Sequence, residues 1–178
     1  MLSRRELLGR FTKVASSTKE AQSFVPLPPY NFNRSLFSKF CLDCPKDCVE
    51  ACSEVCKEGI LKIFEGIPYV DFTQEGCLLC QECAKVCSYD VLELKEKSNP
   101  NWNFKIEISA DKCLAYHKTL CNTCKDICIG VNYRKDIIVF AGLFYPEITE
   151  NCTNCGFCIS VCPTYAIVLT PKKEEINN

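Results

Sequence analysis

Cysteines are the residues in this chain with the most chemistry to offer, and there are 17 of them among 178 residues. A content this high indicates either a disulfide scaffold or metal ligation. All the cysteines fall into four groups along the chain. The second and fourth groups, CLLCQECAKVC and CTNCGFCISVC, share the spacing C-x2-C-x2-C-x3-C. This spacing is typical of loops that bind iron–sulfur clusters, in which three thiolates wrap one side of an iron–sulfide cube.

The first and third groups depart from this spacing. In the third, CLAYHKTLCNTCKDIC, seven residues separate the first two cysteines, and the first, CLDCPKDCVEACSEVC, holds five cysteines. If each group supplies four ligands, one cysteine of the first group is therefore left without a ligand role. One interpretation leaves out Cys56. The other leaves out Cys41, because Ile60-Leu61 follows Cys56 as Val91-Leu92 follows Cys87. We favour Cys56 as the spare, because the longer gap from the last ligand to the next apolar pair then matches the third group.

The spacing predicts four 4Fe–4S clusters with four cysteine ligands each. The predicted ligands are Cys41, Cys44, Cys48, Cys52, Cys77, Cys80, Cys83, Cys87, Cys113, Cys121, Cys124, Cys128, Cys152, Cys155, Cys158 and Cys162. A zinc ribbon would leave the third cysteine of each loop unused. An odd number of cysteines in dense loops also fits poorly with complete disulfide pairing. We expect the single histidine, His117, to be a solvated loop residue, since Rieske-type ligation needs a pair of histidines.

Short apolar runs flank the cysteine groups and predict the strands that position them. Runs that follow a group lie at 60–64, 91–94, 137–140 and 167–169, and runs that precede one lie at 69–72, 104–108 and 145–148. Glu65-Gly66 and Ala141-Gly142 are expected as turns between paired runs. Each repeat is thus a strand, a cysteine loop, a short helical turn and a strand.

The predicted fold class is α+β, with two tandem ferredoxin-like two-cluster modules behind a basic N-terminal arm. The expected boundaries are 1–38 for the arm and an extended linker, 39–100 and 101–172 for the modules, and 173–178 for a tail. The polar stretch SNPNWN at 98–103 is the expected connection between the modules. In two-cluster ferredoxins the last cysteine of one motif ligates the other motif's cluster. We expect this exchange between the first and second groups and between the third and fourth.

Charge is distributed unevenly along the chain. Residues 1–40 carry seven basic and two acidic side chains, a net +5, which leaves −6 for the remainder. The basic residues are scattered, so nucleic acid is not an expected partner. No apolar run is long enough for a membrane span. Arg4 and Arg5 resemble the start of an export signal, but Arg10 and Lys13 interrupt the apolar stretch such a signal needs. We expect an uncleaved cytoplasmic arm in which Arg4, Arg5 and Arg10 bind a partner.

Two segments carry a family resemblance. SRRELLGR at 3–10 and DKCLAYHKTLCNTCKDIC at 111–128 are similar to the start and the third motif of NapF-type ferredoxins of periplasmic nitrate reductase systems. The resemblance runs nearly end to end, although the first motif departs from the family pattern. It implies a cytoplasmic iron–sulfur protein that acts on the catalytic molybdenum subunit, or its precursor, in electron supply or in maturation before export. The cysteines of the second, third and fourth groups match the family's cluster ligands.

The sequence has no nucleotide-binding loop, flavin motif or recognisable substrate site. We therefore expect an electron carrier or accessory protein in place of an enzyme. The alternative function is a generic electron-transfer ferredoxin subunit of another redox enzyme complex.

Overall fold

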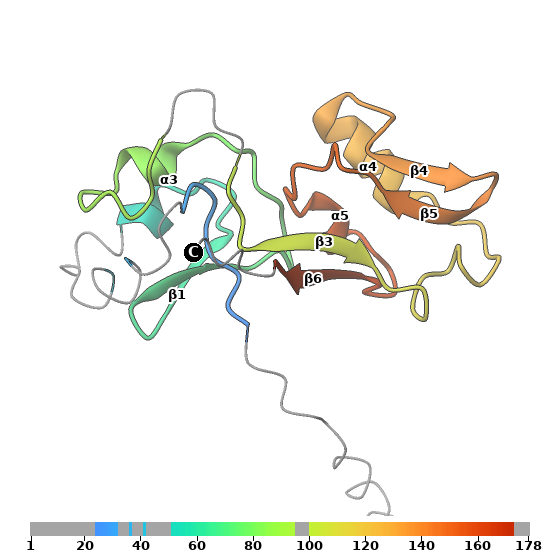
Figure 1. The fold of residues 1–178 in the computed structure, drawn as a ribbon, viewed down its shortest axis with the longest axis horizontal. Coiled ribbons are helices and arrows are strands. Elements are labelled where there is room, and N and C mark those ends of the chain that lie inside the picture. The colour runs from blue at the N-terminus through green and yellow to red at the C-terminus, as the bar shows by residue number, and fades with distance from the viewer. Residues whose placement is uncertain (1–23, 32–35, 37–40, 42–50, 95–99, 173–178) are drawn as a thin grey trace, which may run out of the picture.

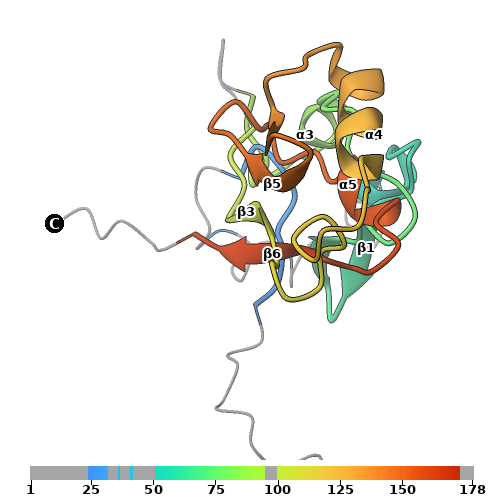
Figure 2. The same cartoon turned by 90° about the vertical axis from the view of Figure 1, so that its right-hand side faces the viewer.

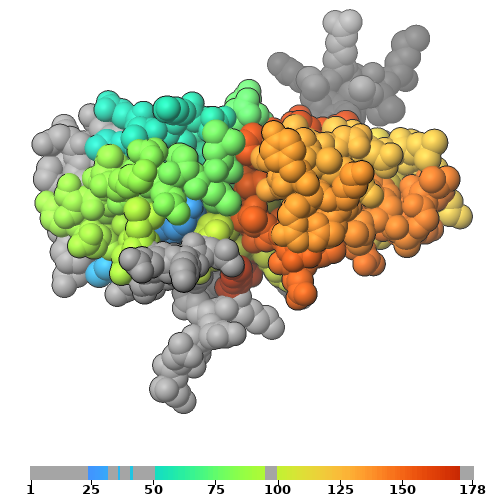
Figure 3. Space-filling view, turned by 90° about the horizontal axis from the view of Figure 1, so that it is seen from above, coloured from blue at the N-terminus to red at the C-terminus, as the bar shows by residue number. Residues whose placement is uncertain are grey.

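The protein is a mixed structure of short helices and small two-stranded sheets. The computed structural model describes residues 24–31, 36, 41, 51–94 and 100–172. The described part falls into a first half, residues 51–94, and a second half, residues 100–172 (Figure 1). The two halves lie side by side and meet along one boundary (Figure 3).

The first half contains a β-hairpin and a short helix. Strands β1 (Leu61–Phe64) and β2 (Ile67–Val70) pair antiparallel, with Leu61 opposite Val70. Glu65 and Gly66 join them with φ angles of 49° and 78°. A positive φ at both turn residues is the geometry that suits the twist of a two-residue hairpin. This confirms the turn expected at Glu65-Gly66. Helix α3 (Glu82–Lys85) follows and makes a single turn.

The second half contains two sheets of two strands. Strand β3 (Phe104–Ile108) pairs antiparallel with the last strand, β6 (Ile167–Pro171), so the start and the end of this half lie together. Strand β4 (Ile138–Ala141) pairs antiparallel with β5 (Phe144–Ile148) around a turn at 142–143. The turn lies one residue later than the expected Ala141-Gly142, because Ala141 still pairs with Phe144 as the last residue of β4. Two helices, α4 (Thr123–Asn132) and α5 (Phe157–Ser160), pack against each other beside the strands (Figure 2).

The run at 91–94 was expected to be a strand, and it is not one. Its apolar residues Val91 and Leu92 are buried, as the pattern requires. The segment beside it, residues 24–31, includes Pro26, Pro28 and Pro29, which lack the N–H that a ladder needs. The two segments are joined by a backbone hydrogen bond from Glu93 N–H to the Tyr30 carbonyl at 3.0 Å, in place of a strand ladder.

The segment 24–31, part of the expected extended connection, has no helix or strand, and its residues 28–31 are buried. Its backbone bonds the first half through Val70 N–H, which donates to the Pro26 carbonyl at 2.9 Å. It bonds the second half through the Asn103 side chain, which accepts from Leu27 N–H at 2.9 Å and donates to the Val25 carbonyl at 2.8 Å. The segment therefore ties the two halves together.

An aromatic cluster fills the junction between the halves. Phe104 and Trp102 are 0% and 1% exposed, and their ring centroids lie 4.9 Å apart. Phe72 of the first half meets both rings at 5.9–6.0 Å, and Phe24 meets Phe104 at 6.3 Å. The end of the expected polar connection at 98–103 is thus part of the core, because Trp102 and Asn103 are buried there.

Among the described helices, none is both long and apolar enough to cross a bilayer.

Candidate metal centres

The cysteine loops of the second and fourth groups have nearly the same backbone geometry. Leu79 and Asn154 each lie two residues after the first cysteine of their loop, with φ of 55° and 56°. The left-handed turn directs each N–H at the preceding thiol, at 3.4 Å from Cys77 Sγ and 3.4 Å from Cys152 Sγ. Such bonds to sulfur are a recognised determinant of cluster potential.

The third cysteine of each of these loops sits on a one-turn helix. Helix α3 carries Cys83 and helix α5 carries Cys158, and both side chains are at least nine-tenths buried. The loop spacing that the sequence repeats therefore corresponds to one repeated local structure. The spacing turns the backbone inward and brings three thiols onto one side of a shared cavity.

The cavities of the second half bring together cysteines from two different groups. One is lined by Cys152, Cys155 and Cys158 together with Cys128 from the end of the third group. The other is lined by Cys113, Cys121 and Cys124 together with Cys162 from the end of the fourth group. Each cavity thus receives three thiols from one group and the last cysteine of the neighbouring group.

A third cavity, in the first half, follows the same rule. Cys77, Cys80 and Cys83 line it together with Cys56, the last cysteine of the first group. The sequence analysis left Cys56 as the spare, and its placement differs from that expectation. Cys56 occupies the position that Cys128 has in the second half, four residues after the preceding cysteine and beside three thiols of the next loop.

The remaining described cysteines of the first and second groups, Cys41, Cys52 and Cys87, line none of these three cavities. Cys87 is half-buried, does not line the Cys56 cavity, and accepts a hydrogen bond from Leu92 N–H at 3.4 Å. Cys162 of the second half similarly accepts from Ala166 N–H at 3.3 Å. In the first group Cys52 is buried and Cys41 half-buried, whereas Cys44 and Cys48 lie outside the described residues, as do Arg4, Arg5 and Arg10.

Burial raises the pKa of several of these thiols. It raises the pKa of Cys77 and of Cys83 to about 12, with neighbouring cysteines adding to the effect. It raises the pKa of Cys124 and of Cys128 to about 11. Several buried thiolates close together repel one another, so the thiols stay neutral unless a positively charged core compensates. An iron–sulfur core supplies that compensation.

Cys162 differs from these thiols. Burial alone would raise its pKa, but backbone N–H groups of Thr164, Ala166 and Ile167 bond its sulfur and lower the pKa below the ordinary value. Donors arranged around sulfur in this way stabilise the thiolate, which is the form that ligates metal.

The donor set fits an iron–sulfur cluster better than a single ion. Each of the three described cavities presents four thiols, and the two cavities of the second half have no carboxylate or imidazole in their lining. Among the described residues, no three cysteine, histidine or acidic side chains converge closely enough to hold one metal ion. A cube of iron and sulfide holds its four cysteine ligands farther apart than one ion does. The exposed ring of His117 lies elsewhere, with Nε2 2.9 Å from the Asp111 carbonyl oxygen.

Two asparagines support cysteine ligands in ways that spacing does not reveal. The side-chain oxygen of Asn154 accepts a hydrogen bond from Ile106 N–H of β3 at 2.8 Å. This bond holds Asn154 in place, and the backbone N–H of Asn154 donates to Cys152 Sγ. Asn132, at the end of α4, donates to Cys128 Sγ at 3.6 Å. Asn132 falls one helical turn after Cys128, and this i,i+4 spacing is a signal that a sequence analysis could use.

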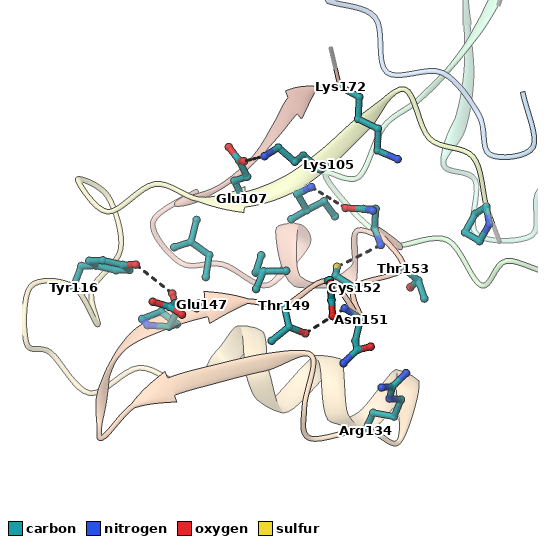
Figure 4. A pocket seen from close by; sticks show the side chains of 17 residues that line it. Lys105, Glu107, Tyr116, Arg134, Glu147, Thr149, Asn151, Cys152, Thr153 and Lys172 are labelled. Atoms are coloured by element: carbon teal, nitrogen blue, oxygen red, sulfur yellow. Dashed lines mark hydrogen bonds and ion pairs between the residues drawn. The ribbon is translucent and has the colours of Figure 1, made fainter. Parts of the chain in front are cut away.

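A groove between β3 and β5 lies near these sites and has a volume of about 840 Å³ (Figure 4). Its lining mixes Lys105, Arg134 and Lys172 with acidic side chains such as Glu107 and Glu147. It reaches a single cysteine, Cys152. The groove is therefore not a cluster site, since it lacks the other thiols.

Comparison with known proteins agrees with this chemistry. The family described as "4Fe-4S binding domain" matches residues 145–168, which span the fourth cysteine group. The ferredoxin-type protein NapF of Haemophilus influenzae is 30% identical over 178 residues, covering 98% of this chain and 97% of the relative. NapF of Escherichia coli is 27% identical over 169 residues, covering 93% and 92%. An uncharacterized ferredoxin of Methanocaldococcus jannaschii is 32% identical over 80 residues, covering 41% of this chain and 91% of the relative. No solved structure gives a significant match.

The cysteine loops, the family match and the thiol-lined cavities define an iron–sulfur protein of the ferredoxin class that binds 4Fe–4S clusters and serves electron transport. Within that class, the chain belongs to the NapF family of ferredoxin-type proteins.

Proposed function

We propose that this protein is an electron carrier with four 4Fe–4S clusters, built as two tandem two-cluster modules at 39–100 and 101–172. The observation that carries the proposal is the composition of the three described cavities, each with three thiols from one loop and the last cysteine of the partner loop. This exchange is the arrangement of two-cluster ferredoxins.

The proposed ligand sets revise the sequence-based assignment at one position. Cys56 joins the ligands, and the spare cysteine is one of the earlier cysteines of the first group. The sets are Cys56, Cys77, Cys80 and Cys83; Cys113, Cys121, Cys124 and Cys162; Cys128, Cys152, Cys155 and Cys158; and Cys87 with three of Cys41, Cys44, Cys48 and Cys52. The last set is inferred by analogy with the other three.

We propose a cytoplasmic protein that serves the catalytic molybdenum subunit of periplasmic nitrate reductase, as electron donor and as maturation accessory. Membership of the NapF family supports this role. The basic start of the chain, SRRELLGR, is the segment proposed to bind the subunit or its precursor through Arg4, Arg5 and Arg10. A plain electron carrier has no need of such a segment.

The electrostatics support a binding role for the arm. Four thiolates around a 2+ core add about two negative charges per cluster. Four clusters would therefore take the region after residue 40 from −6 to about −14 while the arm stays at +5. We therefore expect the positively charged arm, and not the negatively charged remainder of the chain, to bind an acidic partner surface.

A pull-down with the catalytic subunit tests the role of the arm. An Arg4→Ala/Arg5→Ala variant should lose binding and yield less mature nitrate reductase. Lys13→Ala/Lys19→Ala removes the same charge from the same arm outside SRRELLGR and should bind as the unchanged protein does. Equal binding and maturation with all three proteins would contradict the accessory role and favour the generic electron-transfer ferredoxin subunit.

A further inference from the structure

Two cysteine loops, one from each half, are joined directly at the boundary. The backbone N–H of Cys77 donates to the carbonyl oxygen of Cys155 at 2.6 Å. Cys77 lines the cavity shared with Cys56, and Cys155 lines the cavity shared with Cys128. One hydrogen bond therefore connects a proposed ligand of one cluster to a proposed ligand of another cluster in the other half.

Glycines allow the loops to approach this closely. A Cβ added at Gly76 would collide with the ring and the backbone N of Phe157, and a Cβ added at Gly156 would collide with the ring of Phe72. Gly76 precedes Cys77 and Gly156 follows Cys155, so each glycine is next to one partner of this hydrogen bond. An aromatic ring of the opposite half packs against each glycine. Phe72 is in turn fixed by Trp102, with centroids 5.9 Å apart.

We propose that this contact is the passage for electrons between the two halves, and that Gly76 and Gly156 are positioning residues that keep the two clusters close enough for it. The inference rests on the proposed four-cluster function. With clusters bound, one electron would pass between the cluster that Cys56, Cys77, Cys80 and Cys83 would hold and the cluster that Cys128, Cys152, Cys155 and Cys158 would hold, so that one cluster is oxidised as the other is reduced. No bond forms or breaks, and no proton moves.

The contact joins two of the three cavities that the described residues form. The cavity with Cys113 and Cys162 lies elsewhere, because none of the residues that line it takes part in the Cys77–Cys155 hydrogen bond or in the contacts at Gly76 and Gly156.

Electron paramagnetic resonance on the fully reduced holoprotein tests the inference, because magnetic coupling between clusters weakens steeply as they separate. Gly76→Ala should drive the loops apart at Phe157 and remove part of the line broadening that we expect in the unchanged protein. Gly130→Ala is the matched control, since a Cβ at Gly130, within α4, meets nothing within 4 Å. Its spectrum should equal that of the unchanged protein.

Iron and sulfide analysis of the same samples separates the possible failures. An unchanged protein without clusters would refute the proposed function itself. A cluster-replete Gly76→Ala protein with unchanged coupling would overturn only the inference. If Gly76→Ala loses iron, Phe157→Trp is the second variant, because its larger ring should also separate the two loops at this contact. It should then reduce the magnetic coupling between the two clusters. Loss of iron from both variants would also overturn the inference, because the contact would then serve cluster retention.

Discussion

A thiol surrounded by three others has few roles apart from metal ligation. Cys56 lies in such a position, because the cavity that it lines holds Cys77, Cys80 and Cys83. Four thiols that face one cavity would repel one another once ionised if no metal were present. We therefore propose that Cys56, which the spacing favoured as the spare over Cys41, is a cluster ligand.

Replacing Cys56 with serine tests this assignment. Cys56→Ser should lose about four of about sixteen iron atoms, as Cys80→Ser in the same cavity should. Both proteins are to be prepared anaerobically and analysed for iron and labile sulfide. A Cys56→Ser protein with its full iron content, beside a depleted Cys80→Ser protein, would restore Cys56 as the spare.

The protonation of the buried thiols predicts a pH dependence of cluster loading. Burial raises the pKa of Cys77 and Cys83 to about 12 and that of Cys124 and Cys128 to about 11, so these groups bind a proton at neutral pH in the metal-free protein. Each must lose that proton to ligate iron. Loading should therefore release acid and weaken as the pH falls below these pKa values.

Titration during anaerobic reconstitution measures the released protons. Acid release at neutral pH, with lower cluster occupancy at about pH 6 than at about pH 8, is the expected result. Loading that releases no protons and is equal at the two pH values would contradict the protonated state assigned to these thiols.

At the scale of elements, the segment 24–31 reaches a cluster loop as well as joining the halves. The buried Tyr30 hydroxyl donates to the Leu79 carbonyl at 3.2 Å, and the Leu79 N–H donates to Cys77 Sγ at 3.4 Å. In the second half the side chain of Asn154 holds the corresponding peptide by accepting from Ile106 N–H. Different elements thus fix the same donor in the two loops.

Tyr30→Phe removes the hydroxyl and keeps the ring. The Leu79 peptide should then loosen and its bond to Cys77 weaken, which lowers the reduction potential of one cluster because bonds to sulfur favour the more negative reduced state. The ratio of reduced to oxidised cluster at fixed potential should fall about fivefold, the worth of one hydrogen bond. Tyr116→Phe, which removes a hydroxyl bonded to the Pro146 carbonyl outside this loop, is the control. A redox titration with equal midpoints for Tyr30→Phe and the unchanged protein would contradict the prediction.

Local signals predicted the loops and hairpins well. The turn at Glu65-Gly66 and the strand at Phe104–Ile108 depend on neighbouring residues, so their patterns are readable in the sequence. The pairing of the last cysteines depends on contacts between groups, and the count of cysteines could not determine it. The repeated apolar pair after Cys56 did carry the signal, since Ile60 and Leu61 are buried as Val91 and Leu92 are.

Long-range contacts explain the elements that the sequence did not predict. The run at 91–94 has the composition of a strand, but its neighbour contributes prolines and cannot complete a ladder. The polar stretch at 98–103 ends in Trp102, whose indole N–H donates to the Thr153 carbonyl at 2.8 Å. Neither the burial of Trp102 nor that bond follows from its polar neighbours in sequence.

At the scale of the whole molecule, the halves depend on a shared aromatic junction. Trp102→Ala should cost about 3–5 kcal/mol in the free energy of unfolding, because a fully buried indole leaves a cavity between Phe72 and Phe104. Leu143→Ala, at a side chain 69% exposed, should change it by less than about 0.5 kcal/mol. Anaerobic denaturant unfolding of the holoproteins measures both, and equal stability of the two variants would contradict a structural role for the junction.

The hydrophobic core of the described residues is distributed around the cysteine cavities. Cys52, Cys83, Cys128 and Cys158 belong to the same buried cluster as the aromatic junction. Metal binding and folding are coupled when ligands form part of the core. We therefore expect the clusters to contribute to the stability of the fold as well as to electron transfer.

The count of iron and labile sulfide per chain, made on anaerobically purified protein, is the most direct test of four exchanged 4Fe–4S sites. The account predicts about sixteen iron atoms and about sixteen sulfides per chain. A well-folded, colourless protein without labile sulfide, or one that retains only about four iron atoms, would contradict it.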